Sequence, residues 1–349
     1  MLKVAFRVDA SNRIGTGHLI RCTVLAEAVR DIGAEVFFIT NDSEGYTSQM
    51  LQKHGFRFYL ISASNWAADA EETRRLLESE GCDAQWLIVD HYGWDHRGEN
   101  RVKDCVGKII IIDDLANRRH EGDLIIDSTF GEDGTRYCGL ISGHCHGLFG
   151  SKYVLLKSEF RKERACIRSN ARTWDRRHIH LFFGGMDTRN HTVRFSKLLL
   201  ESLSDIEITA VVSKAYRYPK DLMSLQRSYE TRFRFQQDVQ NMASTMLPCN
   251  MAVGAPGTTT WERACMGLVG AYLSISQNQI PILKRLKESG FCEYFGSAET
   301  ITENEFLNQF RKFVMETGQL SRMRDLSFQA VDGRGTERVV DYLLNHLGN

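Results

Sequence analysis

One stretch near the N-terminus combines charged residues, glycines and a histidine in a pattern that suits chemistry on an anionic substrate. It reads RVDASNRIGTGH from Arg7 to His18. Gly15 and Gly17 form a turn between an apolar strand and a helix, so main-chain NH groups at the helix start can face an anion. His18 follows directly, where the positive helix end disfavours the imidazolium. A neutral imidazole there suits a general base for water, and a capping or packing histidine is the alternative.

A second group of polar residues ends the apolar run at 86–90. Asp90, His91, Tyr92 and Gly93 follow one another there. Asp90 can orient an imidazole, and Tyr92 can donate a hydrogen bond to a sugar or cover it. The alternative is an ordinary turn at a strand end, with a buried tyrosine.

Two neighbouring carboxylates, Asp113 and Asp114, end the next apolar run, which starts at Lys108. Paired carboxylates can bind a metal or act as acid and base. Carboxylates that directly follow a strand also commonly cap the turn or helix that comes next. We expect capping here.

A third stretch reads GAPGTTTWE from Gly254 to Glu262 and again places a glycine turn between a strand and a helix. Gly257, Thr258 and Thr259 offer main-chain NH groups at the helix start, which suits a diphosphate without a lysine or a metal. Glu262 lies one turn into this helix and can accept hydrogen bonds from ribose hydroxyls. A capping box with Thr259 is the alternative role of Glu262.

The composition of the chain limits the kinds of macromolecule that it could attract by its charge. Lys and Arg together number 44, as do Asp and Glu, so the formal net charge is zero and no net field recruits nucleic acid or a membrane. The longest apolar runs are far shorter than the roughly 20 residues that span a bilayer. The 9 cysteines show no spacing typical of zinc. We therefore expect a cytoplasmic protein with reduced thiols, no metal, and neither nucleic acid nor membrane as partner.

Apolar runs alternate with helical patterns twice along the chain, which is typical of two parallel sheets with crossover helices. We expect an α/β fold with an N-terminal domain at 1–160 and a C-terminal domain at 175–335, joined by a charged connection, and a final helix at 336–349 that packs on the N-terminal domain. Strands are expected at 4–8, 36–40, 56–61, 86–90, 108–113 and 123–127, and then at 178–183, 206–212, 231–235, 251–254 and 269–273. Open parallel sheets bind ligands where their strands end, and the polar stretches fall at such ends.

Taken together, these motifs resemble the PseG family of UDP-sugar hydrolases, which release 2,4-diacetamido-2,4,6-trideoxy-L-altrose from its UDP conjugate in the pseudaminic acid pathway. Further matching pieces are IDD at 112–114 with RxHxxD ending at Asp123, FGGxD at 183–187, and the pair Asn278-Gln279. The matches span almost the whole chain in family order. Pro256 and Val269 depart from the family pattern, and Pro256 removes one amide donor from the nucleotide turn.

The family is similar to the GT-B glycosyltransferases, including the lipid II-forming N-acetylglucosaminyltransferase. The resemblance implies two Rossmann-like domains with parallel sheets facing a central cleft, and a monomer that converts a UDP-sugar to UDP and free sugar without a cofactor. His18 would activate water for inverting attack at the anomeric carbon, with Tyr92 and Asn278 facing the sugar or the water. The implied substrate-binding residues are Arg7, Asp9, Gly15, Gly17, Arg21, Gly184, Gly185, Asp187, Gly257, Thr258, Thr259, Glu262 and Gln279.

Other functions stay open at this level. A glycosyltransferase would use the same UDP-sugar and also needs a base, but the N-terminal domain lacks an evident basic or apolar patch for a lipid acceptor, which favours hydrolysis. A non-catalytic protein that binds a nucleotide sugar is a second alternative. An NAD-dependent enzyme is disfavoured, because Ile20 stands where the third glycine of the dinucleotide fingerprint is required.

Overall fold

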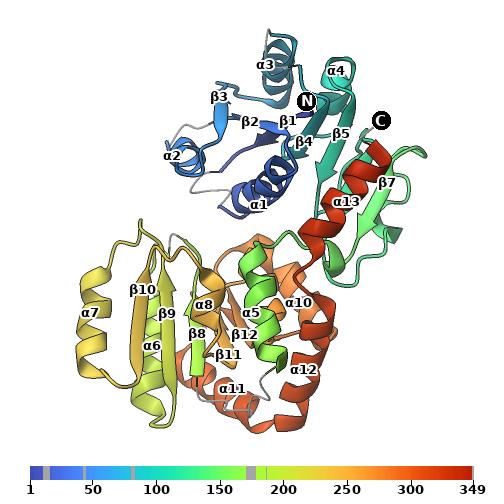
Figure 1. The fold of residues 1–349 in the computed structure, drawn as a ribbon. Coiled ribbons are helices and arrows are strands. Elements are labelled where there is room, and N and C mark those ends of the chain that lie inside the picture. Colours follow the sequence, from blue (N-terminus) through green and yellow to red (C-terminus); the bar gives the residue numbers. More distant parts are fainter. Residues whose placement is uncertain (11–15, 42–44, 80–82, 170–177, 186, 348–349) are drawn as a thin grey trace. The chain divides into compact units, whose positions relative to one another are not determined.

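The structure is a computed structural model that describes residues 1–10, 16–41, 45–79, 83–169, 178–185 and 187–347 (Figure 1). The chain divides into two compact units. The N-terminal unit consists of Met1–Lys157 together with Arg334–Asn349, and the C-terminal unit consists of Ser158–Gly333. Each unit holds one parallel sheet with helices packed on it. The expected fold class, an α/β protein with two parallel-sheet domains, is confirmed.

Strands and helices alternate through the N-terminal unit, and its last helix comes from the end of the chain. Its elements are β1 (Lys3–Val8), α1 (Gly17–Asp31), β2 (Glu35–Thr40), α2 (Tyr46–Lys53), β3 (Arg57–Leu60), α3 (Trp66–Glu78), β4 (Trp86–Asp90), α4 (His96–Val102), β5 (Lys108–Ile112), β6 (Leu124–Asp127), β7 (His146–Phe149) and α13 (Gly335–Leu347).

The C-terminal unit alternates in the same way. Its elements are α5 (Ser158–Ser169), β8 (His178–Phe182), α6 (His191–Ser202), β9 (Glu207–Val212), α7 (Pro219–Ser228), β10 (Phe233–Gln237), α8 (Met242–Met246), β11 (Met251–Gly254), α9 (Thr258–Cys265), β12 (Val269–Ser274), the short 3-10 helix η4 (Gln277–Gln279), α10 (Ile280–Glu288), β13 (Glu293–Ser297), α11 (Glu303–Met315) and α12 (Thr317–Ala330).

The strand order reverses once in each sheet. The N-terminal sheet has the order β3-β2-β1-β4-β5-β6-β7, and the C-terminal sheet has the order β10-β9-β8-β11-β12-β13. The chain therefore builds outward in one direction from β1 and β8, and then in the other direction from β4 and β11. In open parallel sheets a crevice forms at such a reversal, outside the carboxyl ends of the two strands. The two reversal points are the places where this fold positions a ligand.

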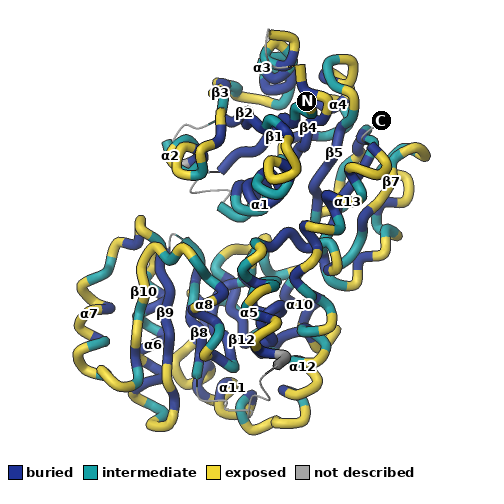
Figure 2. Tube along the Cα trace, in the orientation of Figure 1, coloured by how far each residue is buried: buried dark blue, intermediate teal, exposed yellow. Residues whose placement is uncertain are grey.

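The alternation of side chains along β1 assigns the faces of the N-terminal sheet. Val4, Phe6 and Val8 are buried in a cluster shared with α1 and α13. Ala5 belongs to the cluster on the other face, which includes residues of α3 and α4. Both faces are covered, so the central strands are buried along nearly their whole length (Figure 2). A continuous apolar strand pattern is what such a doubly covered sheet requires.

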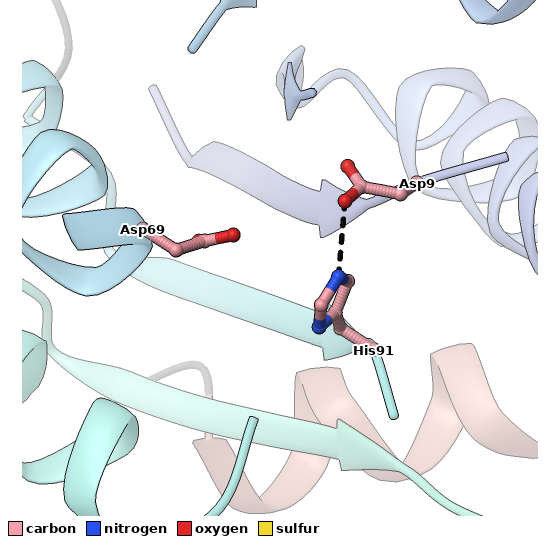
Figure 3. Close-up of side chains that lie close together, drawn as sticks. All are labelled: Asp9, Asp69 and His91. Atoms are coloured by element: carbon pink, nitrogen blue, oxygen red, sulfur yellow. Dashed lines mark hydrogen bonds and ion pairs between the residues drawn. The ribbon is translucent and has the colours of Figure 1, made fainter. Parts of the chain in front are cut away.

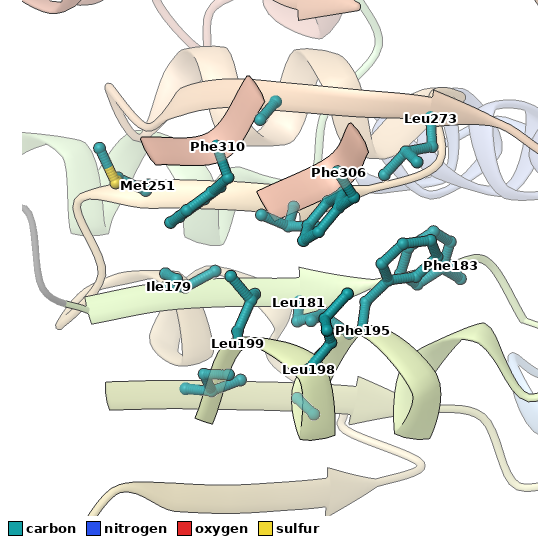
Figure 4. Packing of buried hydrophobic residues seen from close by; sticks show 14 of the residues in the cluster. Ile179, Leu181, Phe183, Phe195, Leu198, Leu199, Met251, Leu273, Phe306 and Phe310 are labelled. Atoms are coloured by element: carbon teal, nitrogen blue, oxygen red, sulfur yellow. The ribbon is translucent and has the colours of Figure 1, made fainter. Parts of the chain in front are cut away.

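The C-terminal sheet shows the same division. Ile179 and Leu181 of β8 lie in a large apolar cluster with Phe195 of α6 and Phe306 of α11 (Figure 4). His180, between them, is fully buried on the opposite side, where its Nε2 atom is 3.3 Å from Oγ1 of Thr245 in α8. Within the described ranges, no helix is both long enough and apolar enough to cross a membrane.

Helix α13 returns the end of the chain to the N-terminal unit. Val339 and Leu343 are fully buried in the cluster that contains Leu25 of α1. The indole Nε1 of Trp86, at the start of β4, donates a hydrogen bond of 3.2 Å to the carbonyl of Leu347. The N-terminal core is therefore completed by residues that lie more than half the chain away in sequence.

Several elements differ from the sequence expectations. Strands β7 and β13 and helices α4 and α7 were not predicted, and α5 is a helix of 12 residues where we expected a charged connection with at most a short helix. Both missed strands lie at sheet edges, where β13 buries only Phe295 and β7 only Leu148. Short edge strands bury too few side chains to produce a clear apolar run.

Leu343 and Leu344 are neighbours on α13, but their side chains are 0% and 43% exposed. We expect Leu343→Ala to lower the free energy of unfolding by about 2–5 kcal/mol, because the truncation leaves a cavity in the cluster shared with α1. Leu344→Ala is the matched control and should change that free energy by less than about 0.5 kcal/mol. Urea denaturation followed by circular dichroism measures both. Equal losses would contradict the described packing of α13.

Candidate functional site

Polar side chains gather where the strand order reverses in the N-terminal sheet. Strands β1 and β4 are paired so that Val8 lies beside Asp90, the last residue of β4. Asp9 follows β1, and His18 lies in the first turn of α1, the helix that comes after β1. A small pocket opens at this point, lined by Asp9, His18, Asp90, His91, Tyr92 and Gly93.

His18 and Asp90 form a buried pair in this pocket. Nδ1 of His18 lies 2.5 Å from Oδ1 of Asp90. Asp90 is 1% exposed and His18 is 8% exposed. Asp90 was predicted from the sequence as a possible partner for an imidazole, and His18 is the imidazole that it contacts.

This contact determines which nitrogen of His18 carries the proton. A nitrogen and a carboxylate oxygen 2.5 Å apart need a proton between them, so Nδ1–H donates to Asp90. Nη2 of Arg21 is 3.0 Å from the same nitrogen, but it donates to Oδ1 of Asp90 at 2.7 Å. Nε2 of His18 therefore carries the lone pair, and it forms no hydrogen bond within the described part of the chain. This nitrogen can accept a proton.

Arg21, one helical turn beyond His18, connects two carboxylates. Its Nε and Nη2 atoms bind the two oxygens of Asp90 at 2.6 and 2.7 Å, and its Nη1 binds Oδ2 of Asp114 at 2.9 Å. Burial alone would raise the pKa of Asp90, but the charge of Arg21 and the contact with His18 outweigh it and hold this pKa well below its usual range. Asp90 is therefore ionised and fixed in place.

Tyr92 extends this network to the pocket surface. Its hydroxyl donates a 2.8 Å hydrogen bond to Oδ1 of Asp114, and its ring meets the ring of His18 edge-on with centroids 4.4 Å apart. Partial burial and the charge of Asp114 raise the pKa of Tyr92 above its ordinary value, so the hydroxyl stays protonated. Tyr92 is 40% exposed, so the alternative of a buried tyrosine is wrong. The oxygen can still accept a hydrogen bond from a ligand.

The two carboxylates after β5 have different roles. Asp113 accepts hydrogen bonds from the main-chain NH of Ala116 at 2.9 Å and from Arg118 at 2.7 Å, so it stabilises the following turn, as expected. Asp114 instead contacts Arg21 and Tyr92. The expectation of capping is therefore correct for Asp113 and wrong for Asp114.

A second network of charged residues shares Asp9 and His91 with the pocket and extends from it into the interior. Asp9, Asp69 and His91 each place one potential ligand atom within 4.8 Å of the others, a spacing that a metal ion could use (Figure 3). The guanidinium of the fully buried Arg7 binds both carboxylates, with Nη2 3.0 Å from Asp9 and Nε 2.8 Å from Asp69. Trp94 also donates to Asp69, at 2.8 Å. A cation would have to displace a guanidinium here, so these residues fit a role in joining β1 to α3 better than a metal site.

His91 differs from His18 because both of its nitrogens are occupied. Nδ1 accepts a 3.1 Å hydrogen bond from the NH of Gly93, so Nε2 carries the proton and donates to Asp9 at 3.0 Å. A Cβ atom at position 93 would lie 2.8 Å from the His91 ring, so this turn requires glycine. His91 therefore holds the turn that carries Tyr92.

The second candidate site lies at the strand reversal of the C-terminal sheet. β11 ends at Gly254, and Gly257 is the N-cap of α9. A Cβ atom at position 254 would lie 1.9 Å from the carbonyl oxygen of Phe182, and the φ angle of Gly257 is +142°. Both glycines are therefore needed for this turn. The NH groups of Thr258 and Thr259 open the helix, where they have no partner within it.

The capping box of α9 involves Thr260. The NH of Gly257 donates to Oγ1 of Thr260 at 3.2 Å, and the NH of Thr260 donates to the carbonyl of Gly257 at 3.0 Å. Thr259 lies inside the helix, so the alternative capping box of Thr259 with Glu262 is wrong. Glu262 lies on the second turn of α9 and is partly exposed.

The loop after β8 lies beside this turn, because β8 and β11 are neighbours. Gly184 has a φ angle of +89°, and the carbonyl of Gly185 accepts a hydrogen bond from the Ser213 hydroxyl. Asp187 caps α6, since its two oxygens accept the NH groups of His191 and Thr192 at 2.8 and 2.9 Å.

Asn278 and Gln279 lie in η4, just after β12. Oδ1 of Asn278 accepts a hydrogen bond of 2.6 Å from the Ser276 hydroxyl, and Oε1 of Gln279 accepts the NH of Ile275 at 2.9 Å. Asn278 is exposed, which leaves its amide NH₂ group accessible. Gln279 mainly fixes the loop.

The sequence-predicted residues thus fall into two groups, one in each unit. The first contains Arg7, Asp9, Gly17, His18, Arg21 and Tyr92, and the second contains Gly184, Gly185, Asp187, Gly257, Thr258, Thr259, Glu262, Asn278 and Gln279. Gly15 lies outside the described residues. Asp69 and the role of Asp114 were not predicted from the sequence. The position of Asp114 directly after β5, next to β4, was a usable signal.

Comparison with other proteins gives distant relatives. No protein-family model matches the chain. An uncharacterized protein of Methanocaldococcus jannaschii is 23% identical over 76% of this chain and 54% of its own length, so the chain spans about half of that relative. The UDP-2,4-diacetamido-2,4,6-trideoxy-beta-L-altropyranose hydrolase of Campylobacter jejuni is 26% identical over 72% of this chain and 84% of its own. The spore coat polysaccharide biosynthesis protein SpsG of Bacillus subtilis is 20% identical over 98% of both chains.

Solved structures show the same fold over the full chain. MurG of Acinetobacter baumannii has a TM-score of 0.66 at 14% identity, covering 99% of this chain and 100% of its own. MnaA of S. aureus, solved with UDP, has a TM-score of 0.63 at 11% identity, covering 100% and 97%. The fold is that of the GT-B glycosyltransferases.

Replacing Asp90 by Asn should reverse the tautomer of His18. An amide NH₂ group opposite Nδ1 requires Nδ1 to be an acceptor, so the proton moves to Nε2. Two-dimensional ¹⁵N–¹H NMR of the histidine rings distinguishes the tautomers. We expect a lone pair on Nε2 in the unaltered protein and on Nδ1 in Asp90→Asn. His54, which is 2.7 Å from Glu27, is the internal control and should not change. An Nε2–H tautomer of His18 before substitution would contradict the assignment.

Proposed function

We propose that this chain hydrolyses a UDP-linked 2,4-diacetamido-2,4,6-trideoxyhexose to the free sugar and UDP, with His18 as the general base and without a metal. The observation that carries the proposal is the buried contact between Nδ1 of His18 and Asp90, which in a neutral imidazole leaves the lone pair on Nε2, in a pocket lined by sugar-compatible groups. A neutral imidazole with a fixed tautomer is suited to remove a proton from water.

The reaction is a single displacement at the anomeric carbon. The water oxygen forms a bond to that carbon while the bond from the carbon to the diphosphate oxygen breaks, which inverts its configuration. One water proton moves to Nε2 of His18, and the bonding pair leaves with UDP. The imidazolium that forms lies against the ionised Asp90, which stabilises the charge as it develops.

Tyr92 and Asn278 are proposed to contact the sugar or the attacking water. The hydroxyl proton of Tyr92 is committed to Asp114, so Tyr92 would accept a hydrogen bond from the substrate through its oxygen. The amide NH₂ group of Asn278 would donate one. Neither residue needs to transfer a proton in this scheme, which leaves His18 as the base.

The C-terminal unit is proposed to hold the nucleotide. The NH groups of Thr258 and Thr259 begin α9 at the strand reversal, where the positive helix end favours a diphosphate. Glu262 would accept hydrogen bonds from the ribose hydroxyls. The UDP in the MnaA structure and the UDP-sugar named for the Campylobacter hydrolase support this choice of ligand.

Hydrolysis is tested by incubating the purified protein with the UDP-sugar alone. We expect release of UDP and free sugar at equal rates, because water is the acceptor. His18→Asn should lower kcat at least about 100-fold and leave the Kd of UDP within about twofold, since the base acts only in the chemical step. His54→Asn, which changes the histidine at the end of α2 that contacts Glu27, should keep full activity. UDP release that requires an added sugar acceptor would show transfer, and full activity of His18→Asn would refute the assigned base.

Glu262→Gln tests the nucleotide contact. We expect the Kd of UDP to rise about tenfold, because the variant loses charge-assisted hydrogen bonds to the ribose. UDP with a 2′,3′-dideoxy ribose should bind the variant and the unaltered protein equally well. Calorimetric titration measures both ligands, and Glu288→Gln, at an exposed position on α10, is the control. An equal loss for both ligands would place Glu262 elsewhere than at the ribose.

A further inference from the structure

A fully buried arginine lies beneath the glycine turn of the C-terminal unit. Arg263 is on α9 and is 0% exposed. Helical side chains lean toward the start of their helix, and its guanidinium accordingly reaches back to the N-terminal end of α9. Nη1 donates to the carbonyl of Ala255 at 3.2 Å, and Nη2 donates to the carbonyl of Phe182 at 3.1 Å.

These two carbonyls belong to the strand reversal itself. Phe182 ends β8, and Ala255 follows β11. A Cβ atom at Gly254 would lie 2.9 Å from Nη2 of Arg263, so the guanidinium is packed directly against the turn. Arg263 therefore joins the two segments from which the proposed diphosphate site is built.

The charge of Arg263 is not paired within the described part of the chain, although its sequence neighbour Glu262 attracts it over a longer distance. Among the described residues, no carboxylate lies within ion-pair distance of it, and its Nε atom has no hydrogen-bond partner. Burial raises the pKa of the adjacent Tyr272 to about 12, so that ring is neutral. Burial, followed by the charge of Arg263, lowers the pKa of His180, so it is neutral as well.

The charge of the other fully buried guanidinium near a candidate site is balanced by carboxylates. Arg7 contacts Asp9 and Asp69, and the partly buried Arg21 contacts Asp90 and Asp114. A buried charge without a partner is strongly unfavourable, so an arginine in this setting calls for an anion from outside the chain. The open turn at the start of α9 is the place where an anion can come closest to it.

We infer that Arg263 is a positioning residue for the diphosphate, whose uncompensated charge beneath the Gly254–Gly257 turn adds to the positive helix end and selects a nucleoside diphosphate over the nucleoside. Arg263 does not touch the ligand. It acts through the main chain that it holds and through its field. The inference rests on the proposed function for the identity of the ligand as UDP.

Two substitutions separate the charge from the hydrogen bonds. Arg263→Gln keeps a donor for the carbonyls but removes the charge, whereas Arg263→Lys keeps the charge. In calorimetric titrations we expect Arg263→Gln to weaken UDP binding about tenfold while uridine binding changes less than about twofold. Arg263→Lys should keep UDP binding within about threefold of the unaltered protein. Equal UDP binding by all three proteins, or equal losses in both variants, would overturn the inference.

Arg164→Gln is the matched control. Arg164, on α5, is also buried and also binds main-chain carbonyls, those of Cys265, the last residue of α9, at 2.7 Å and of Phe328 on α12. Its substitution should leave the ratio of UDP to uridine affinity unchanged. Loss of that ratio in Arg164→Gln would show that general loosening of α9, rather than the charge of Arg263, is responsible.

A measurement on the unaltered protein covers the case in which Arg263→Gln does not fold. Inorganic pyrophosphate should raise Tm more than sodium chloride of equal ionic strength, because it supplies the missing counter-charge. No difference between the two salts would overturn the inference. If UDP fails to bind but pyrophosphate stabilises the protein, the proposed function fails while the role of Arg263 stands.

Discussion

The parallel direction of the strands is the constraint on which both candidate sites depend. Parallel strands place all their carboxyl ends at one edge, and a reversal in strand order separates the loops that leave two neighbouring strands. This happens between β1 and β4 in one unit and between β8 and β11 in the other. The same geometric rule therefore gives each unit one candidate site, and the sequence decides which side chains each site contains.

The two candidate sites differ in how their buried charges are balanced. In the N-terminal unit, the charges are internally balanced: Asp90 and Asp114 bind Arg21, and Asp9 and Asp69 bind Arg7. Removing one partner of such a buried pair typically costs about 3–5 kcal/mol, so the side chains around His18 are held rigidly. In the C-terminal unit, Arg263 has no such partner among the described residues, and the first turn of α9 holds no acidic residue. One unit is suited to orient a base, and the other to attract an anion.

Much of this arrangement could be read from the sequence, for physical reasons. Central strands such as β4 and β5 are covered on both faces, so they are continuous apolar runs, and the polar residues after them mark the sheet edge. That reasoning located His18, Asp90 and Tyr92. It could not assign Asp113 and Asp114, because neighbours in a chain point to different sides and only the fold shows which one meets Arg21. A role for Arg263 could not be predicted either, because the side chain of an arginine on a helix ordinarily reaches solvent.

Helix α13 has a consequence for how the protein is made. The N-terminal sheet and α1 leave the ribosome well before the helix that covers part of their apolar face, because the whole C-terminal unit lies between them in the chain. During synthesis, Leu25 and the other apolar residues of α1 lack the packing contacts of Val339 and Leu343 until α13 has been made. The nascent N-terminal unit thus exposes an apolar surface until α13 has been synthesised, and its hydrophobic core is completed only then.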